Sequence, residues 1–537
     1  MVDITYSVEI DVAKTDFASG ALDVSARVLA FSCAEGAESA YELVTQPARL
    51  LLTLYNGDGA FFPDGGGAYA GSVRRGLLVR VQMMYGGQTQ QLWHGWIESW
   101  QFDPNPLSQQ PVVIITAVDR SYELFDAEYM PRLAMDVRVD EEIRQVLDDV
   151  LALPYAESET TGHVLFDFSE FGTATFADNS AYYSLEQAVE TLDYTGTPPL
   201  AETETLNARQ YIEALVAAEM EGLFWWSGRD GTFRFLDRHY YLDHQAVVAT
   251  VGASSTAPLL EAGPALYGDD LINRATIHYT IRRVGTPNSV LYEMDEPLVL
   301  YGNGSREFTA QYRDPDAPNA HVYGIDMAYP VAGSDYTVNQ ISDGSGLNYQ
   351  QYAEVHVEFG ASSARVMVRN LSPTLPIWFT TFRLRGTPLS TYDRRSVTRS
   401  DADSIAAHGH WRYTGAIELI NDAVTVEDYC NYLVRQRATP VMRLPEVQFN
   451  ANHNATLAAY ARDVEVGDRV RVNLTNYGDT GHDRQYTVVG LRYIYEAGGG
   501  TLPAQLLTSW VLRPADRIVG VRFDDDNARF DSATFAL

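Results

Sequence analysis

Two histidines and two aspartates lie close together in one polar segment, at Asp401, Asp403, His408 and His410. Imidazole nitrogens and carboxylate oxygens are ligands of zinc and related ions, so the segment is a candidate metal site. However, an i, i+2 histidine pair in a polar stretch is more often part of a solvated loop. We therefore assign no metal ligand to this chain.

Carboxylates and aromatic rings could together act on sugars. The chain has 71 Asp and Glu residues, so a carboxylate pair able to hydrolyse a glycosidic bond is possible, but chance pairs are also expected. Aromatic side chains at alternating strand positions are more often core than sugar-stacking surfaces. The tryptophans concerned are Trp93, Trp96, Trp100, Trp225 and Trp226. The acidic run Asp524–Asn527 could bind a cation, but a flexible acidic arm is the simpler interpretation.

The common catalytic signatures are missing, because the sequence contains no HExxH, GxSxG, P-loop or CxxC motif. The two cysteines, Cys33 and Cys430, allow at most one disulfide, and Cys430 falls on the apolar face of a predicted helix. The Gly, Asn and Asp residues of Asn56–Gly59 and Gly228–Gly231 serve the geometry of turns. We predict a protein that is not an enzyme and binds no cofactor.

Length and composition indicate a folded chain of several domains. With 537 residues, about three to five domains are expected. Hydrophobic residues make up 46% and charged residues 20%, which is ordinary for a folded protein. Aromatic residues fall in short alternating runs that favour strands. No apolar run is long enough to cross a bilayer, and the start of the chain lacks the pattern of a signal peptide.

The formal net charge of −32 argues against stable binding of nucleic acid, whose affinity for proteins depends on neutralised phosphates. Lys14 is the only lysine, so nearly all the positive charge is carried by arginine. This composition suits a GC-rich genome or a salt-rich host, bacterial or archaeal.

The first third of the chain alternates apolar and polar residues with period two, as in Leu50, Leu52 and Leu54. The same alternation appears at Leu77–Met83 and Val113–Ala117. Glycine-rich turns separate these runs. The pattern predicts a small antiparallel barrel that ends near Phe125.

The next segment shows helical spacing. Apolar residues from Ile143 to Leu151 predict a helix behind an acidic first turn, and a second helix is expected from Ala208 to Glu221. The second helix leads into a hairpin of Leu223–Trp226 and Phe233–Leu236. We expect residues 156–206 to be mostly loop, with a short helix near Leu185–Leu192.

A new strand pattern opens at Leu271, and three alternating runs from Glu354 to Gly386 are typical of a β-sandwich. A helix is predicted around Val426 to Val434, with Thr425 and Asp428 as its capping pair. Strands are expected again at Val441–Phe449, Arg469–Leu474, Tyr486–Tyr495 and Gln505–Leu512, and the residues from Arg517 onward are expected to form an arm.

Several of these segments resemble a known family. The chain contains ARLLLTLYNGDGAFFP, then RRGLLVRVQMMYGGQTQQLWHGWIESW, and later ARQYIEALVAAEMEGLFWWSGRDGTFRFLDR and VEVGDRVRVNLT followed by QYTVVGLRY. In order and spacing these strings resemble the siphovirus minor tail proteins, or baseplate hub proteins, of the tail tip. The segment RNLSPTLPIWFTTFRLRG looks like an insertion that some siphovirus tail proteins carry.

The resemblance implies a mainly β, multi-domain fold with minor α content. Two tail-tube-like antiparallel β-barrels would carry helical and β-sandwich insertions. The implied division is a first barrel at 1–125, a helix-containing accessory domain with a β-hairpin at 126–264, a second barrel at 265–310 and 411–515, a sandwich insertion at 311–410, and a C-terminal arm at 516–537.

The resemblance also implies a function. A homotrimer of such chains presents six barrels to the six-fold tail tube, joins the tube or distal tail protein to tail fibres near the tape-measure protein, and lines the channel for genome ejection. The implied location is the tail tip of the virion. The alternative is a receptor- or glycan-binding tail-tip protein, with or without glycan hydrolase activity.

The acidity of the chain has two interpretations in this setting. A channel that passes DNA should repel phosphate, so part of the negative charge is expected to face the lumen. Alternatively, the charge solvates the outer surface, as it does in many acidic proteins.

Overall fold

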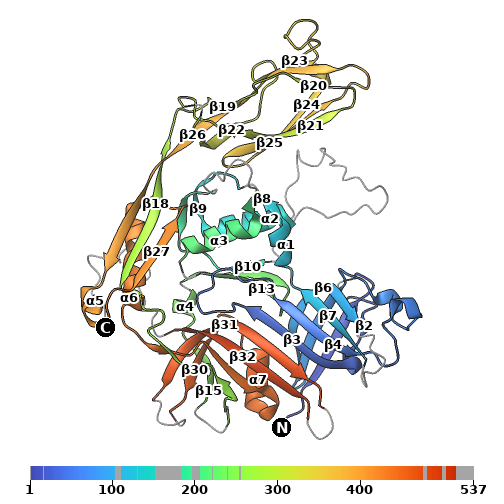
Figure 1. The fold of residues 1–537 in the computed structure, drawn as a ribbon, viewed down its shortest axis with the longest axis vertical. Coiled ribbons are helices and arrows are strands. Elements are labelled where there is room, and N and C mark those ends of the chain that lie inside the picture. The colour runs from blue at the N-terminus through green and yellow to red at the C-terminus, as the bar shows by residue number, and fades with distance from the viewer. Residues whose placement is uncertain are drawn as a thin grey trace.

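The computed structural model describes residues 2–15, 17–102, 111–129, 131–151, 183–195, 206–220, 222–238, 240–252, 256–317, 319–475, 481–498 and 503–515. The predicted class, mainly β with minor α in several sheets, is confirmed. Figure 1 shows a broad base of strands, a helical layer above it, and an arm that rises along one side to a tip unit. None of the described helices is long and apolar enough to cross a bilayer.

The first half of the base is an antiparallel run of strands that bury every second side chain. Leu50, Leu52 and Leu54 are fully buried, and so are the alternating residues of the two other predicted runs. The predicted strands of this region are therefore confirmed. They are β1 (Thr5–Asp11), β2 (Leu22–Asp23), β3 (Val28–Gly36), β4 (Arg49–Tyr55), β5 (Leu78–Tyr85), β6 (Gln88–Phe102) and β7 (Val112–Val118).

The second half of the base combines two short strands from the middle of the chain with elements from its C-terminal part. Its elements are β15 (Val247–Val251), β16 (Glu261–Ala262), β29 (Glu446–Asn450), α7 (Ala455–Asp463), β30 (Arg469–Asn473), β31 (Asp483–Glu496) and β32 (Gln505–Pro514). Strand β3 pairs with β31 over Ala30↔Glu496 to Gly36↔Gly490, so the two halves form one 13-stranded sheet. Helix α7 buries Leu457, Ala458 and Ala461 in the core that both halves share.

The end of the β3–β31 ladder requires glycine. Gly36 has a φ of 80°, a left-handed conformation that side chains with a Cβ rarely adopt. Opposite it, a Cβ on Gly490 would lie 2.0 Å from the carbonyl oxygen of Ala37, where no carbon atom fits. The two backbones approach this closely because neither residue has a side chain.

The accessory segment lies above the base and combines helices with short strands. The helices are α1 (Tyr122–Asp126), α2 (Val139–Leu151), α3 (Ala208–Ala218) and α4 (Tyr240–Asp243), and the strands are β8 (Glu128–Tyr129), β9 (Met135–Arg138), β10 (Tyr183–Leu185), β11 (Thr191–Tyr194), β12 (Leu206–Asn207), β13 (Leu223–Ser227) and β14 (Thr232–Leu236). The two predicted helices and the hairpin β13–β14 are confirmed. Asn207 and Gln210 form a reciprocal capping box at the start of α3.

The predicted short helix near Leu185–Leu192 is wrong. Leu185 belongs to β10, which runs parallel to β14, and Leu192 belongs to β11, which pairs with β9. The two leucines are seven residues apart, a spacing that suits a helix face, but each is placed by pairing with a strand far away in the sequence.

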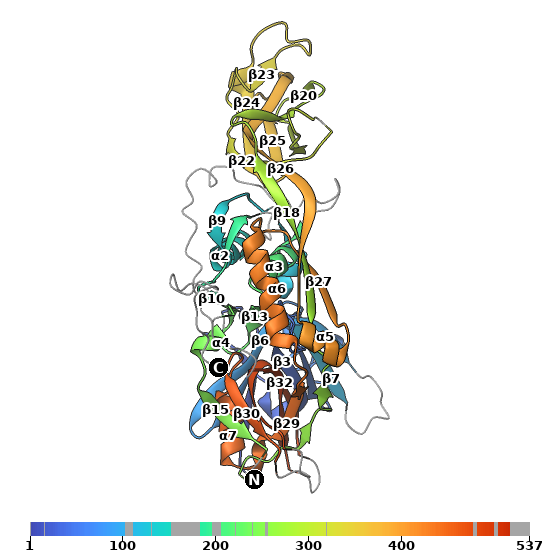
Figure 2. The same ribbon diagram turned by 90° about the vertical axis from the view of Figure 1, so that its left-hand side faces the viewer.

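The arm is a twisted ribbon of long strands. It consists of β17 (Leu266–Tyr267), β18 (Arg274–Val284), β26 (Ile377–Ser400), α5 (Ala402–His408), β27 (Arg412–Ile417), α6 (Ala423–Arg437) and β28 (Met442–Arg443). Helix α6 lies along this ribbon (Figure 2). The tip adds β19 (Ser289–Glu293), β20 (Leu298–Leu300), β21 (Ser305–Gln311), β22 (Tyr323–Ala328), β23 (Tyr336–Asn339), β24 (Ala353–Phe359) and β25 (Ser363–Asn370).

The cap of α6 differs from the prediction. Asp422 is the N-cap, and its carboxylate accepts hydrogen bonds from both the backbone N–H and the hydroxyl of Thr425. The predicted capping pair of Thr425 and Asp428 is therefore wrong, because the helix begins before Thr425. Cys430 is buried on the inner face of α6 and Cys33 is buried in the base, and both are free thiols.

The strands within residues 265–310 and 411–515 belong to more than one sheet. The strands β18, β19 and β20 pair with β26, whereas β29 to β32 belong to the base sheet. The reason is the length of β26, whose 24 residues run from the arm into the tip. The division of the chain into folding units stays a prediction, and the predicted C-terminal arm lies outside the described residues.

The paired strands β3 and β31, which we call the seam, can be tested with the substitution Gly490→Ala. We expect it to lower the free energy of unfolding by about 1–3 kcal/mol, because the added Cβ must push the two backbones apart. The measurement is urea unfolding followed by tryptophan fluorescence. Gly71→Ala is the matched control, since a Cβ at Gly71 meets no atom within 4 Å. Equal stability of the two variants would contradict this account of the seam.

Candidate functional site

The segment considered as a candidate metal site contributes to a helix cap. The carboxylate of Asp401 accepts the backbone N–H of Ser404 at 2.8 Å, which caps α5. The indole N–H of Trp411 donates to the carbonyl oxygen of His408 at 2.9 Å. Within the described part of the chain, no three His, Cys, Asp or Glu side chains are placed to share a metal ion.

The tryptophans divide between core and surface. Trp93, Trp225 and Trp226 are buried, so the core interpretation is confirmed for them. Trp96 is half-buried below the guanidinium of Arg120. Trp100 is half-buried at an open hollow, and its indole N–H donates to the carbonyl oxygen of Arg74 at 2.8 Å. The acidic run Asp524–Asn527 lies outside the described residues.

The two predicted turns are confirmed, and one of them has a second role. The Asn56 side chain accepts the N–H of Phe61 at 3.0 Å, and Gly231 has a φ of 73°. The turn at Gly228–Gly231 also carries Arg229, a charged residue that is 7% exposed. This turn is the end of the β13–β14 hairpin, and it rests on the base sheet.

Arg229 connects both halves of the base. Its guanidinium donates to the Tyr493 hydroxyl at 2.6 Å and lies 4.0 Å from the carboxylate of Glu35. Tyr493 belongs to β31 and Glu35 to β3, the two strands of the seam. A further hydrogen bond of 2.8 Å reaches the carbonyl oxygen of Arg462 in α7. The side chain of Arg229, at the end of the hairpin, thus contacts both strands of the seam.

Burial shifts the pKa of Glu35, the carboxylate beside Arg229. Removal from water raises the pKa of Glu35, while Arg229 and hydrogen bonds from Ser227 and Trp225 act in the opposite direction. The indole N–H of Trp225 donates to Glu35 at 3.4 Å. The carboxylate is surrounded by fixed partners and has no open space for a substrate, so the cluster is suited to holding elements together.

A second buried cluster joins the accessory segment to the arm. Arg238 lies 2.5 Å from Glu190 and 3.9 Å from Glu219, and its guanidinium lies 5.8 Å from the ring centroid of Tyr429. Glu219 follows α3, whereas Tyr429 belongs to α6. Burial raises the pKa of Glu219 to about 7. This contact positions α6, and with it the arm, relative to the accessory segment.

Glu142 is a third buried acid, located on α2 and facing α3. It accepts a hydrogen bond from the Tyr211 hydroxyl at 2.8 Å. Burial raises the pKa of Glu142 to about 7, although the tyrosine hydrogen bond acts in the opposite direction. Near neutral pH a substantial share of this side chain therefore carries a proton.

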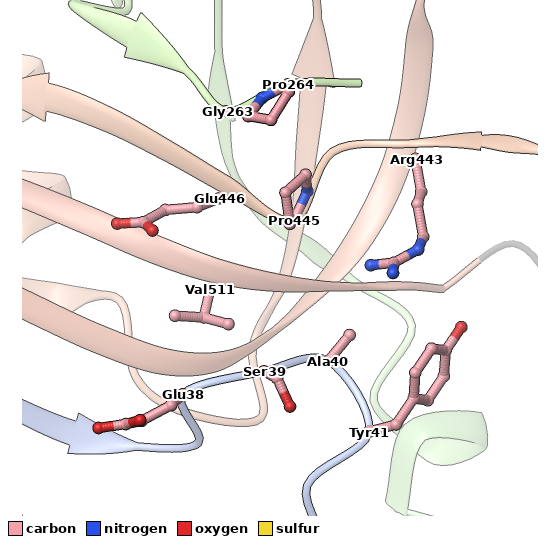
Figure 3. A pocket seen from close by; sticks show the side chains of 10 residues that line it. All are labelled: Glu38, Ser39, Ala40, Tyr41, Gly263, Pro264, Arg443, Pro445, Glu446 and Val511. Atoms are coloured by element: carbon pink, nitrogen blue, oxygen red, sulfur yellow. The ribbon is translucent and has the colours of Figure 1, made fainter. Parts of the chain in front are cut away.

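A cleft of about 350 Å³ opens where the two base halves meet the arm (Figure 3). Around it, the hydroxyl of Tyr41 donates to Asp270 at 2.5 Å, and Arg443 forms an ion pair with Asp269. Glu38 and Glu446 extend toward the same side of the cleft in Figure 3. Arg492 lies between these two segments, bonding to the Glu446 carboxylate and to the carbonyl oxygen of Glu38.

The side chains around the cleft form a contact region between the base and the arm. A catalytic carboxylate pair needs one acid held neutral in an apolar environment, and Glu446 is instead bound to an arginine. Glu38 is exposed. The guanidinium of Arg437 covers the Tyr41 ring at 3.9 Å, which links this loop of the base to α6. The polar contacts of the cleft therefore connect the base to the arm.

Comparison with known proteins gives weak likenesses to solved structures. No family model matches the chain, and no curated protein matches it either. A tail protein from Neisseria meningitidis MC58 aligns at 9% identity and a TM-score of 0.44, covering 94% of this chain and 96% of that one. The tail protein of prophage MuSo2 from Shewanella oneidensis aligns at 9% identity and a TM-score of 0.42, covering 95% and 99%.

A component of the type VI secretion system from E. coli, described as similar to T4 bacteriophage tail proteins, aligns at 8% identity and a TM-score of 0.34, covering 91% of this chain and 74% of that one. Scores below 0.5 at such low identity do not establish a shared fold. These likenesses therefore carry no argument about the function of this chain.

Sequence reasoning missed the buried arginines. Arg229 was part of a turn motif, and Arg238 follows the hairpin, so both residues looked like ordinary surface charges. A signal was present for Arg229, because it closely follows the continuous apolar run Leu223–Trp226. Charged residues are almost never fully buried unless they are paired, and their partners here are distant in the sequence.

A double-mutant cycle tests the Arg229 cluster. We expect Arg229→Met to lower the free energy of unfolding by about 3–5 kcal/mol, because Glu35 is left buried without its cation. The double variant Glu35→Gln/Arg229→Met should recover more than about 1 kcal/mol of that loss. The measurement is urea unfolding at neutral pH, with Arg306→Met as an exposed control. Additive effects would contradict the pairing.

The buried acids predict a dependence of stability on pH. Because the folded pKa of Glu142 is raised, the folded chain keeps a proton that the unfolded chain loses, so this stabilising contribution is lost as pH rises from about 4.5 through 7. Glu142→Gln should therefore make the decline between pH 5 and 8 smaller by about 2 kcal/mol.

The matched control for this pH effect is Glu141→Gln. Glu141 is the neighbouring residue on α2, and its side chain is 51% exposed and paired with Arg138. We expect its pH profile to follow that of the wild type. Thermal melting across the pH range measures both variants, and parallel profiles for all three proteins would remove Glu142 as the cause.

Proposed function

We propose that this chain is a structural subunit at the tail tip of a tailed virus, a baseplate hub or minor tail protein. As a homotrimer it would join the tail tube to distal fibres and line the channel through which DNA leaves. The observation that carries the proposal is the base sheet, in which two β units of one chain are joined side by side through β3 and β31.

The geometry of a ring supports this proposal. A closed ring of strands has no free edges, and subunits reach that state by continuing each other's sheets. Here the seam joins two neighbouring β units into one sheet within a single chain. Three such chains would supply six units, which matches a six-fold tube without requiring six subunits.

The buried clusters support a mechanical role. Arg229 holds the hairpin against the seam, and Arg238 holds α6 against the accessory segment. Each cluster joins elements that are far apart in the sequence, so the base is connected to the accessory segment and the accessory segment to the arm. A rigid connector between a tube and its fibres needs this property more than it needs a reactive group.

The arm supplies reach away from the base. A strand of 24 residues such as β26 can extend up to roughly 80 Å. It ends in a tip where the loops after β20, β23 and β25 lie together, as the pairs Leu300↔Ile377 and Asn339↔Trp378 require. Several large apolar side chains are exposed there: Tyr301, Ile341, Leu347, Leu371 and Leu375. We assign this tip to contact with a fibre.

The same tip favours a second candidate function, which is binding of a receptor or glycan. Tyr301 is 72% exposed at the end of the arm, and an exposed aromatic ring can stack on a sugar. The acidic charge fits either role, because it can face a DNA channel or the surrounding water.

The decisive experiment locates the protein in the virion. We expect antibodies against this chain to label the end of the tail opposite the capsid, and the purified chain to bind tail-tube protein in sedimentation-velocity experiments. Label along the tube, or none on intact particles, would contradict the proposal.

A chain that instead binds host polysaccharide, and loses that binding in Tyr301→Ser, would favour the second candidate.

A further inference from the structure

The three-stranded part of the arm has two different faces. On one face, Ala275, Ile277 and Tyr279 of β18 lie in the apolar core beneath α6. Figure 2 shows α6 on that side of β18 and β27. The side chains at the neighbouring positions of the same strands point to the opposite face of the sheet, because successive side chains of a strand alternate. We call that opposite side the open face.

The open face is polar and has no acid at its strand positions. Across it, Thr276 of β18 lies between Thr398 of β26 and Thr414 of β27, and Arg274 lies between Ser400 and Arg412. The hydroxyls of Thr276 and Thr398 are 2.9 Å apart. His278 continues the same row, between Ser396 and Ala416. In a chain with 71 acids and a net charge of −32, a sheet face of hydroxyls, arginines and a histidine is an exception to the overall composition.

Two arginines of the open face have no acidic partner among the described residues. Arg394 forms an ion pair with Glu418 at the upper end of the face. By contrast, neither Arg274 nor Arg412 makes a salt bridge within the described part of the chain. Many arginines of this chain are paired with acids, and Arg412 is exposed. The positive charge at this end of the face is therefore available to another molecule.

Strand β27 also has a free edge, by which we mean a side with no strand partner, although α3 lies near part of this strand. It pairs in parallel with β18, and among the described strands no other pairs with its outer side. Trp411 is 49% exposed and Tyr413 is 40% exposed beside that edge. Unpaired N–H and C=O groups at a sheet edge bind another polypeptide, and a sugar or a nucleic acid cannot continue their ladder.

We propose that the open face and the free edge of β27 form the contact with a second copy of this chain, which presents an acidic surface to Arg274 and Arg412. Chains that each carry −32 repel one another unless their contact surfaces hold opposite charge. The open face carries arginine and His278 and lacks Asp and Glu at its strand positions, while Trp411 and Tyr413 lie at the edge of β27 on its α6 side.

This inference deepens the proposed function, because it names the surface that holds the hub together as an oligomer. It does not depend on the tail itself. The chain could label the tail tip while this surface remained free, and this surface could join copies of a protein that has another role.

The test is sedimentation equilibrium of the full chain and two kinds of variant. We expect the wild type to form an oligomer at micromolar concentration, and Arg274→Glu/Arg412→Glu to raise the dissociation constant at least about tenfold, because like charges then face each other. Rising salt concentration should weaken the wild-type oligomer and affect the double variant less. Ala416→Trp, which adds bulk to the open face without charge, should also weaken it.

The matched control is Arg306→Glu, since Arg306 is another exposed arginine without a salt bridge to any described residue, located on β21 of the tip. Its dissociation constant should equal that of the wild type. Unchanged melting temperatures in all variants exclude misfolding as the cause. A monomeric wild type, or an oligomer that resists both open-face variants, would overturn the proposal, whereas tail-tip labelling tests the proposed function separately.

Discussion

The ladder between β3 and β31 is the constraint on which the rest of the structure depends. It joins strands that are more than 450 residues apart in the chain, so the accessory segment, the arm and the tip are all excursions of the chain from the base that return to it. Gly36 and Gly490 allow the two backbones to approach at one end of the ladder. Beside it, Arg229 brings the accessory hairpin onto both strands at once.

Charged side chains at such a position are costly to bury, and an apolar contact of the same shape would be equally stable or more stable. The charges instead select one position of the hairpin on the sheet over other positions. An apolar hairpin end could rest at several places on a β-sheet, whereas Arg229 is satisfied only where Glu35, Tyr493 and the end of α7 converge. The same reasoning applies to Arg238 between Glu190 and Glu219. We regard these clusters as fixing orientation more than adding stability.

The distribution of charge connects the fold with the proposed assembly. Arginine supplies nearly all positive charge, and much of it is used within the chain, in pairs such as Arg443 with Asp269. The open face of the arm is a region where arginines remain without an acid among the described residues. An acidic chain that keeps a few such cations on an uncovered sheet face has the surface that assembly of like-charged subunits requires.

The local elements could be predicted from side-chain periodicity: the buried alternation of β4, β5 and β7, the helices α2, α3 and α6, and the hairpin β13–β14. Periodicity is a property of neighbouring residues. It therefore says nothing about which strands pair, and tertiary structure alone decided that β18 joins β26, that β31 joins β3, and that Leu185 and Leu192 lie in strands. The burial of Arg229 was decided in the same way, because partners distant in the chain make its charge tolerable inside the protein.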